Sequence, residues 1–377
     1  MLAHPKNNFD FVRMVAALCV LYSHQYALMG LPEPSVLGAH SLGGFAVLVF
    51  FSISGFLVAQ SWRVDPNIWR FTAKRLLRVW PGLAVAILLA ALVLGPLVST
   101  LPLRAYYAHP LIPEYLLNLR FVVRDALPLQ FIGSAIPGAI NGALWTIPLE
   151  LKCYAALLLL GVVGALRLKW LLPLVTLAAA STYFYLFPGM DALLARYQLT
   201  GTTNFLMQFS LFFFAGVSLY GLGIHLQPAR ARLAAAVAVV AAGLALFLGQ
   251  PLLALWLAVP TLTLVLGNAS SPGVRSAGRF GDLSYGIYIY AFPVQQTFVW
   301  LCKDSLSWWP LLIITTAVTL LLAFLSWHLI ENPALQFKPK RRRSMGPADA
   351  SVDRLDVQPV QPVPPVQPAL DLMPAAK

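Results

Sequence analysis

The stretch FDFVRMVAALCVLYSH, residues 9–24, decides the fold class of this chain. Its apolar run continues to residue 29 and so reaches the roughly 20 residues that a helix needs to cross a bilayer. Two residues that are costly in hydrocarbon, Arg13 and His24, interrupt this run. Their spacing is about three helical turns, so both side chains face the same side of one helix, about 16 Å apart along its axis. We therefore predict a first membrane span that carries a functional pair.

The rest of the chain continues this pattern with nine further apolar segments of spanning length. The ten predicted spans lie near residues 10–29, 43–61, 79–99, 143–164, 170–187, 204–224, 233–249, 251–267, 281–301 and 309–330. Pro251 alone divides the seventh from the eighth and the fifth is short, so nine or eleven spans are the alternatives. The sequence predicts an all-α polytopic membrane protein of about ten spans.

The composition agrees with a membrane protein. Of 377 residues, 59% are hydrophobic and 11% are charged, whereas a soluble domain has about 25% charged residues. The net charge of +12 is concentrated in the tails and in alternate loops. By the positive-inside rule, this distribution predicts that both termini are cytoplasmic, and it argues against nucleic acid as a partner. The three cysteines lie in apolar segments without metal-ligand spacing, so we expect neither a disulfide framework nor a metal site.

The chain divides into two predicted domains at residue 337. Residues 1–337 hold all the spans, and the loop 100–142, rich in Pro, Gly and Tyr, is predicted to be a partial cap on the non-cytoplasmic side. From Lys338 a basic run is followed by a Pro/Val/Gln tract that is too polar and Pro-rich to form a core. We predict that residues 338–377 are a disordered cytoplasmic tail.

Glu150 is a second costly residue, in the predicted fourth span. Counted from opposite surfaces, Glu150 and His24 reach similar depths, with Ser52 and Ser54 slightly closer to the cytoplasm. The plainer alternative is that His24 hydrogen-bonds a neighbouring helix and Glu150 pairs with Lys152, although residues two apart on a helix point apart. The matched depth favours a catalytic layer.

A cluster of cations, Lys74, Arg75 and Arg78, recurs at helical spacing just before Pro81. Positive-inside anchoring explains such a cluster when it stands alone. Beside Arg13, however, it predicts a binding site for phosphates on the cytoplasmic face, because guanidinium groups fit phosphate oxygens with paired hydrogen bonds.

Six motifs in order carry a resemblance to a known family. They are FDFVRMVAALCVLYSH, GGFAVLVFFSISGFLVAQSW, the Arg75-Leu-Leu-Arg78 step before Trp-Pro, ALWTIPLELKCY, FGDLSYGIYIYAFPV and HLIENP. In a ten-span frame, they make residues 7–337 similar to the membrane acyltransferase-3 family. Its members O-acylate bacterial polysaccharides, lipopolysaccharide O-antigens and Nod factors.

The resemblance implies roles for individual residues. His24 matches the essential histidine of the family and Arg13 its partner, while Arg75 and Arg78 match its paired arginines and Glu150 the glutamate of its Trp-x4-Glu element. The residues implied to bind substrate are Ser52, Ser54, Trp145 and Tyr288. One departure is Ala291, where the family commonly has a histidine, whose role is then absent or supplied by Tyr288 or Tyr290. The fused esterase-like domain of some members is also missing.

The implied function is O-acylation at the inner membrane, by transfer of an acyl group from cytoplasmic acyl-CoA to a carbohydrate hydroxyl. Acetyl-CoA is the expected donor, with a succinyl donor as the alternative. His24 would act as general base, Glu150 would orient its imidazole, and Arg13 with the paired arginines would hold the CoA phosphates. An acyl-histidine intermediate is the alternative path. Two other functions compete: a secondary transporter of a glycan or lipid-linked precursor, and a scaffold that acts through its Pro-rich tail. The acceptor and the oligomeric state are left open.

Overall fold

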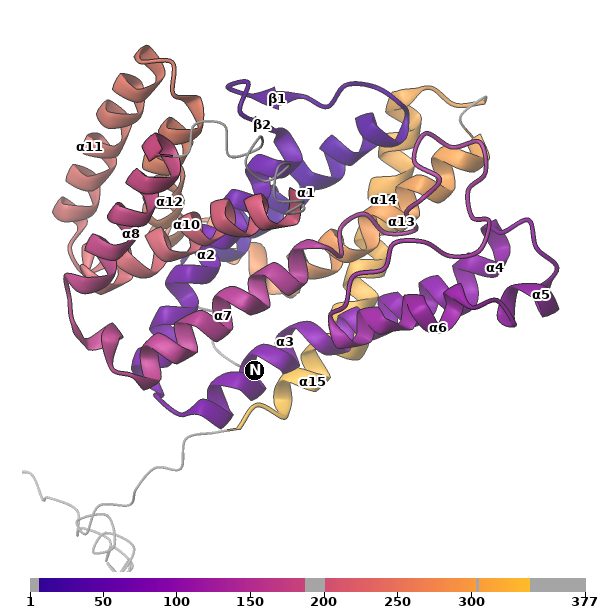
Figure 1. Cartoon of the computed structure of the whole chain (residues 1–377), viewed down its shortest axis with the longest axis horizontal. Coiled ribbons are helices and arrows are strands. Elements are labelled where there is room, and N and C mark those ends of the chain that lie inside the picture. The colour runs from indigo at the N-terminus through magenta and orange to yellow at the C-terminus, as the bar shows by residue number, and fades with distance from the viewer. Residues whose placement is uncertain (1–6, 187–200, 303–304, 340–377) are drawn as a thin grey trace, which may run out of the picture. The chain divides into compact units, whose positions relative to one another are not determined.

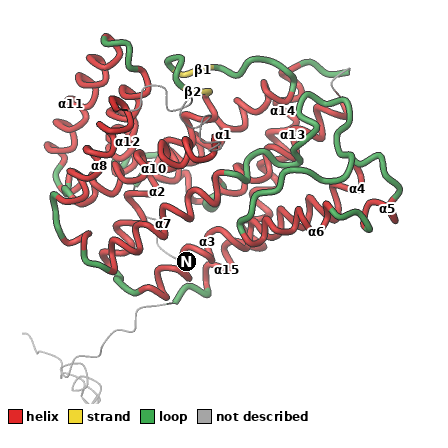
Figure 2. Tube along the Cα trace, viewed as in Figure 1, coloured by secondary structure: helices red, strands yellow, loops and turns green. Residues whose placement is uncertain are grey.

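The computed structural model describes residues 7–186, 201–302 and 305–339 of the chain, and this part is mostly helical, with long loops and almost no strand (Figures 1 and 2). Its only named strands are β1 (Ser35–Val36) and β2 (His40–Ser41), which form one short antiparallel pair within the described ranges. The predicted all-α fold class is confirmed. The predicted tail lies outside the described residues, apart from Lys338 and Pro339.

The long helices follow the predicted spans in order. They are α1 (Phe9–Leu28), α2 (Leu42–Val64), α3 (Ile68–Leu89), α7 (Thr146–Val162), α8 (Leu171–Ser181), α10 (Gly201–Gly221), α11 (Pro228–Phe247), α12 (Pro251–Asn268), α13 (Ser284–Cys302) and α14 (Trp308–Ser326). Shorter helices complete the described part: α4 (Gly95–Val98), α5 (Leu103–Tyr107), α6 (Leu111–Tyr115) and α15 (Asn332–Gln336). Pro251 begins α12, so it does divide the seventh predicted span from the eighth.

Seven helices in the described residues are long and apolar enough to cross a membrane. The three other predicted spans are helical as well, but they differ in length or polarity. α7 has 17 residues, α8 continues through a π turn to Leu186, and α13 buries the polar pair Gln295 and Gln296. A helix packed among other helices tolerates such polar residues, because their hydrogen-bond partners come from protein. The multi-pass architecture is therefore established, while the count of ten stays a prediction.

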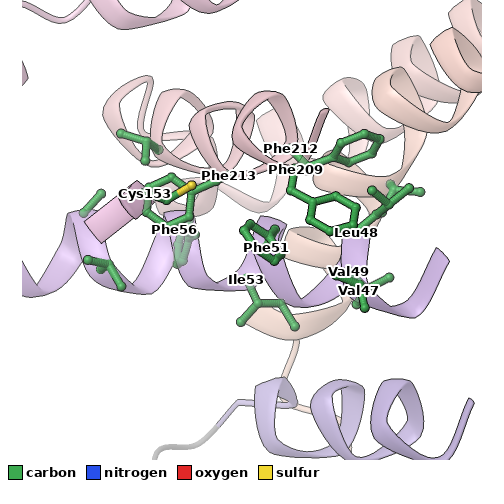
Figure 3. Close-up of a cluster of buried hydrophobic side chains, with 14 of the residues drawn as sticks. Val47, Leu48, Val49, Phe51, Ile53, Phe56, Cys153, Phe209, Phe212 and Phe213 are labelled. Carbon is green, nitrogen blue, oxygen red and sulfur yellow. The ribbon is translucent and has the colours of Figure 1, made fainter. Parts of the chain in front are cut away.

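α2 packs against α1, α7, α10 and α12 and lies at the centre of the largest hydrophobic core. Figure 3 shows phenylalanines of α10 beside those of α2, and the rings of Phe51 and Phe209 lie 4.9 Å apart. Two glycines permit this close contact. A Cβ on Gly55 would lie 1.9 Å from the Phe213 carbonyl oxygen, and one on Gly216 would lie 2.2 Å from that of Ser52. Small residues at such crossings are what membrane helices use to approach each other.

α3 begins at Ile68, eleven residues before the predicted start of the third span at 79. The side chain of Asn67 caps the helix by accepting a hydrogen bond from the backbone N–H of Arg70 at 2.9 Å. The cationic stretch is thus the first part of one continuous helix rather than a loop. Arg75 and Arg78, three residues apart, consequently lie on one face of α3.

The loop 100–142 folds over one end of the helices, as predicted for a partial cap. Tyr106 and Tyr115 are fully buried there, and the Tyr106 hydroxyl donates to the backbone carbonyl of Ala91 at 2.8 Å. The loop also reaches α13, because the Gln296 side chain donates to the carbonyl of Ile136 at 2.6 Å. These contacts fix the loop against α13 and against the turn that follows α3.

Candidate functional site

Two cavities lie along α1, one beside each member of the predicted pair. The arginine cavity is lined by Arg13 and by a further set of residues that includes Ser54, Arg75, Arg78, Glu150, Tyr154 and Tyr285. The histidine cavity is lined by His24 together with Glu33, His40, Gly43, Gly44, Gly142 and Trp145. Val47, Thr146 and Tyr288 line both cavities and so form the boundary between them. Arg13 lines one cavity and His24 the other, and their service at two ends of one path stays a prediction.

Asp282 joins two of the three arginines that the sequence analysis assigned to phosphate binding. Its Oδ2 lies 2.8 Å from a guanidinium nitrogen of Arg13 and 2.6 Å from one of Arg78. Arg13 also pairs with Asp10 at 2.6 Å. These carboxylates neutralise much of the charge that an incoming phosphate would meet. Asp282, two residues before α13, therefore links the start of α1 to α3.

Glu331 is a second carboxylate beside Arg78, at 3.7 Å, and its side chain is only 2% exposed. Sequence reasoning did not assign Asp282 or Glu331 to the site. Both lie inside motifs that carried the resemblance, FGDLSYGIYIYAFPV and HLIENP, and this position was the available signal. Their partner could not be read from the sequence, because Arg78 is more than 200 residues from either.

Arg75 differs from its two neighbours because no carboxylate in the described part of the chain pairs with it. Its guanidinium donates to the Ser61 hydroxyl at 3.3 Å and lies over the Phe71 ring, and its Nε is buried without a partner. The adjacent cations Arg70 and Lys74 are paired with Asp65 at 2.7 and 2.6 Å. Arg75 thus keeps the most free hydrogen-bonding capacity for an anion.

Glu150 lies in the arginine cavity rather than beside His24. Its Oε1 accepts hydrogen bonds from the Ser54 hydroxyl at 2.6 Å and from the Tyr154 hydroxyl at 2.5 Å. No hydrogen bond between Glu150 and His24 occurs among the described contacts, and Lys152 is not its partner either. The matched depth inferred from residue counts did not account for the direction in which α7 faces. The negative charge of Glu150 therefore offsets part of the positive charge of the arginines that line this cavity.

His24 lies edge-on to the Phe292 ring, with the ring centroids 5.2 Å apart. Its Nδ1 is buried and has no hydrogen-bond partner within the described residues. Tyr288 lies at the boundary, where its hydroxyl is 2.7 Å from the Thr146 hydroxyl. Trp145, predicted to bind substrate, is held against the Phe205 ring at 5.0 Å and lines the histidine cavity.

Ser52 is the one predicted site residue that lines neither cavity. It is fully buried, and its hydroxyl donates to the carbonyl of Leu48 one turn earlier at 2.8 Å. The structure does not support the prediction that Ser52 binds substrate. Its hydroxyl is buried and already bonded to the backbone of its own helix, so it is not available to a ligand in either cavity. Of the two tyrosines proposed to replace the family histidine, Tyr288 reaches the cavities, whereas the Tyr290 hydroxyl lies 3.4 Å from Ser326.

Comparison with known proteins assigns this chain to a protein family. The type 3 family model described as "Acyltransferase domain" matches residues 6–328. An O-acetyl transferase of Shigella phage Sf6 is 30% identical over 87% of this chain and 96% of its own length. Nodulation protein 10 of Rhizobium leguminosarum bv. viciae is 29% identical over 88% of this chain and 94% of its own. No solved structure matches the chain.

Proposed function

The chain belongs to the acyltransferase-3 family and is a membrane-bound O-acyltransferase, and we propose that it moves an acetyl group from cytoplasmic acetyl-CoA to a carbohydrate hydroxyl. The observation that carries this proposal is the pair of cavities on α1 with a shared boundary. One cavity is cationic, and the other contains the His24 imidazole, whose Nδ1 is buried. Transfer between two substrates that arrive from opposite sides needs such an arrangement. Family membership also weighs against the competing transporter.

The donor binds from the arginine cavity. CoA carries several phosphates. Among the arginines that line this cavity, Arg75 is the one whose guanidinium is least occupied by hydrogen bonds to the protein. Arg13 and Arg78 add positive potential, but Asp282 already pairs with both. The thioester arm then runs along α1 toward His24, a path of about 16 Å at 1.5 Å per residue. Glu150 and the Tyr154 hydroxyl lie beside the start of this path.

The reaction occurs where the cavities meet. The imidazole of His24 accepts the proton of the acceptor hydroxyl as its oxygen attacks the thioester carbonyl carbon. The carbon–sulfur bond breaks, and the departing CoA thiolate takes the proton from the imidazolium. The result is an O-acyl ester and free CoA thiol. The Tyr288 hydroxyl, which lies 2.7 Å from the Thr146 hydroxyl at this boundary, donates to the oxyanion.

The acetyl group and the carbohydrate are inferred from different sources. The phage relative is named an O-acetyl transferase, which favours acetyl over succinyl. The family, whose members modify bacterial glycans, supports a carbohydrate acceptor, and we propose the inner membrane as the location. An acyl-histidine intermediate would use the same residues in two steps.

The proposal is tested by supplying labelled acetyl-CoA to one side of the membrane at a time. Inverted membrane vesicles from cells that express the protein are given radiolabelled acetyl-CoA, and the glycan fraction is analysed by mass spectrometry. We expect labelled glycan carrying one added acetyl mass per modified residue. Sealed right-side-out vesicles given the same acetyl-CoA should form none. Equal labelling from both sides, or glycan movement without acylation, would contradict the proposal.

A further inference from the structure

The histidine cavity contains polar groups that the reaction above does not use. Glu33 comes from the connection between α1 and β1, and His40 comes from β2. The basic residues predict that this connection lies on the non-cytoplasmic side, where a surface glycan would arrive. The volume of the cavity, about 430 Å³, lies within the range of small-molecule sites.

Glu33 is held in place by the residue that precedes the catalytic histidine. The Ser23 hydroxyl donates a short hydrogen bond to Oε2 of Glu33, and Ser23 itself is fully buried. The site lies over the crossing of α1 and α2, because a Cβ on Gly43 would meet Ser23 at 3.1 Å and the Glu33 carboxylate at 3.8 Å. No lysine or arginine of the described chain pairs with Glu33. Its second oxygen is therefore available to accept a hydrogen bond from a ligand.

His40 adds a second polar side chain to the cavity. Its Nε2 is buried and makes no hydrogen bond of good geometry among the described residues, and the Gln208 side chain lies beside the ring. Burial lowers the pKa of His40, which favours the neutral form of its imidazole. An unpaired buried polar atom is costly unless a ligand or water satisfies it.

Trp145 supplies an apolar face to the same cavity. Its ring packs against Phe205 and Phe209, with centroid distances of 5.0 and 5.9 Å, and this packing holds it rigid. A carboxylate, an imidazole and a fixed aromatic face together suit a ligand with hydroxyl groups on one side and C–H groups on the other. A pyranose ring has this character.

Building on the proposed function, we propose that Glu33, His40 and Trp145 form the acceptor site and that the acceptor is a neutral sugar residue. Glu33 accepts a hydrogen bond from a hydroxyl next to the one that His24 activates. No lysine or arginine is found among the described lining residues of this cavity, whereas the Glu33 carboxylate is. A uronate or phosphorylated sugar would bring a second anion beside Glu33, and the repulsion between the two like charges is unfavourable. The site thus selects against acidic residues of a glycan.

Glu33→Gln tests the site because it keeps the side-chain shape and removes the charge. Inverted vesicles that contain the native glycan are given labelled acetyl-CoA, and retention of labelled CoA by the purified protein is measured separately. We expect glycan labelling to fall about ten- to a hundredfold, as for loss of a hydrogen bond to a charged group. CoA retention should stay at the wild-type value. Glu114→Gln, an exposed carboxylate on α6 outside both cavities, is the matched control and should label normally.

Three results would overturn the acceptor site while leaving the transfer reaction intact. They are normal labelling by Glu33→Gln, an equal loss of CoA retention, and an acetyl group found on an acidic residue of the glycan. If Glu33→Gln does not accumulate, Ser23→Ala, which removes the anchor of Glu33, should give a smaller loss of labelling with CoA retention unchanged. A wild-type protein that labels no glycan at all would instead contradict the proposed function.

Discussion

Arg75 and Arg78 lie one turn apart on α3, yet their surroundings give them different tasks. Arg78 is committed to Asp282 and Glu331, and Arg75 has only a neutral hydroxyl as partner. A family motif treats the two as a pair, because their spacing is all that the sequence shows. The structure separates an arginine that stabilises the helix assembly from one that is free to bind a phosphate.

Substitution of the two arginines should therefore give different defects. Arg75→Gln should raise the KM for acetyl-CoA about tenfold or more while the melting temperature stays close to wild type. Arg78→Gln should lower the melting temperature, since Asp282 and buried Glu331 lose a partner. Steady-state kinetics and thermal denaturation of purified variants measure both effects. Arg230→Gln, on the exposed start of α11, is the control cation. An unchanged KM in Arg75→Gln would refute the assignment of Arg75.

At the scale of the helices, α2 and α10 form the tightest crossing near the core. Gly55→Ala should destabilise the protein by about 1–3 kcal/mol or more, because its Cβ would overlap the backbone of Phe213. Gly243→Ala on α11 is the matched control. A Cβ there meets nothing within 4 Å, so it should be neutral or stabilise by up to about 1 kcal/mol. Thermal unfolding in detergent measures both, and equal stability of the two variants would contradict the close crossing.

The connection between α2 and α3 is fastened by Asp65, which pairs with Arg70 and Lys74. Their hydrogen bonds hold the pKa of Asp65 well below its usual value of about 4. A depressed folded-state pKa means that this stabilisation is complete above about pH 4 and is lost as the pH falls below it. The melting temperature of wild type should thus exceed that of Asp65→Asn at neutral pH, and the difference should shrink in acid. A difference that does not change with pH would contradict this role.

The helices themselves could be predicted from the sequence, because apolar runs of spanning length are strongly determined by the bilayer. All ten predicted spans coincide with helices, including the short α8. The start of α3 was missed by eleven residues, since its first turns are cationic and carry no apolar signal. A hydropathy profile does not detect a helix boundary that is set by a polar capping residue such as Asn67.

The candidate site could be predicted only in part, because the sequence indicates how deep a side chain lies in the membrane but not the direction in which it points. Counting residues places His24 and Glu150 at one level, but it does not say which neighbour each side chain faces. α7 turns Glu150 toward Ser54 and Tyr154, and it is a loop residue, Glu33, that enters the cavity of His24. Loop residues carry no periodicity, so no sequence pattern identified Glu33.

For the molecule as a whole, the catalytic unit is expected to end before the Pro-rich tail. The family model ends at residue 328, and the compact unit of the structure ends at Pro339. A chain truncated after Pro339 should keep wild-type acetyl transfer in inverted vesicles at equal protein level. Loss of transfer by a well-accumulated truncated protein would favour the competing scaffold, in which the tail carries the function.

The central claim is that His24 activates the acceptor at the meeting point of two cavities. The most direct measurement is the rate at which purified His24→Ala transfers labelled acetyl groups from acetyl-CoA to the native glycan. We predict a fall of about a hundredfold or more at normal protein level, as for loss of a general base. His328→Ala, exposed at the end of α14, should transfer at the wild-type rate. A wild-type rate in His24→Ala would contradict the account.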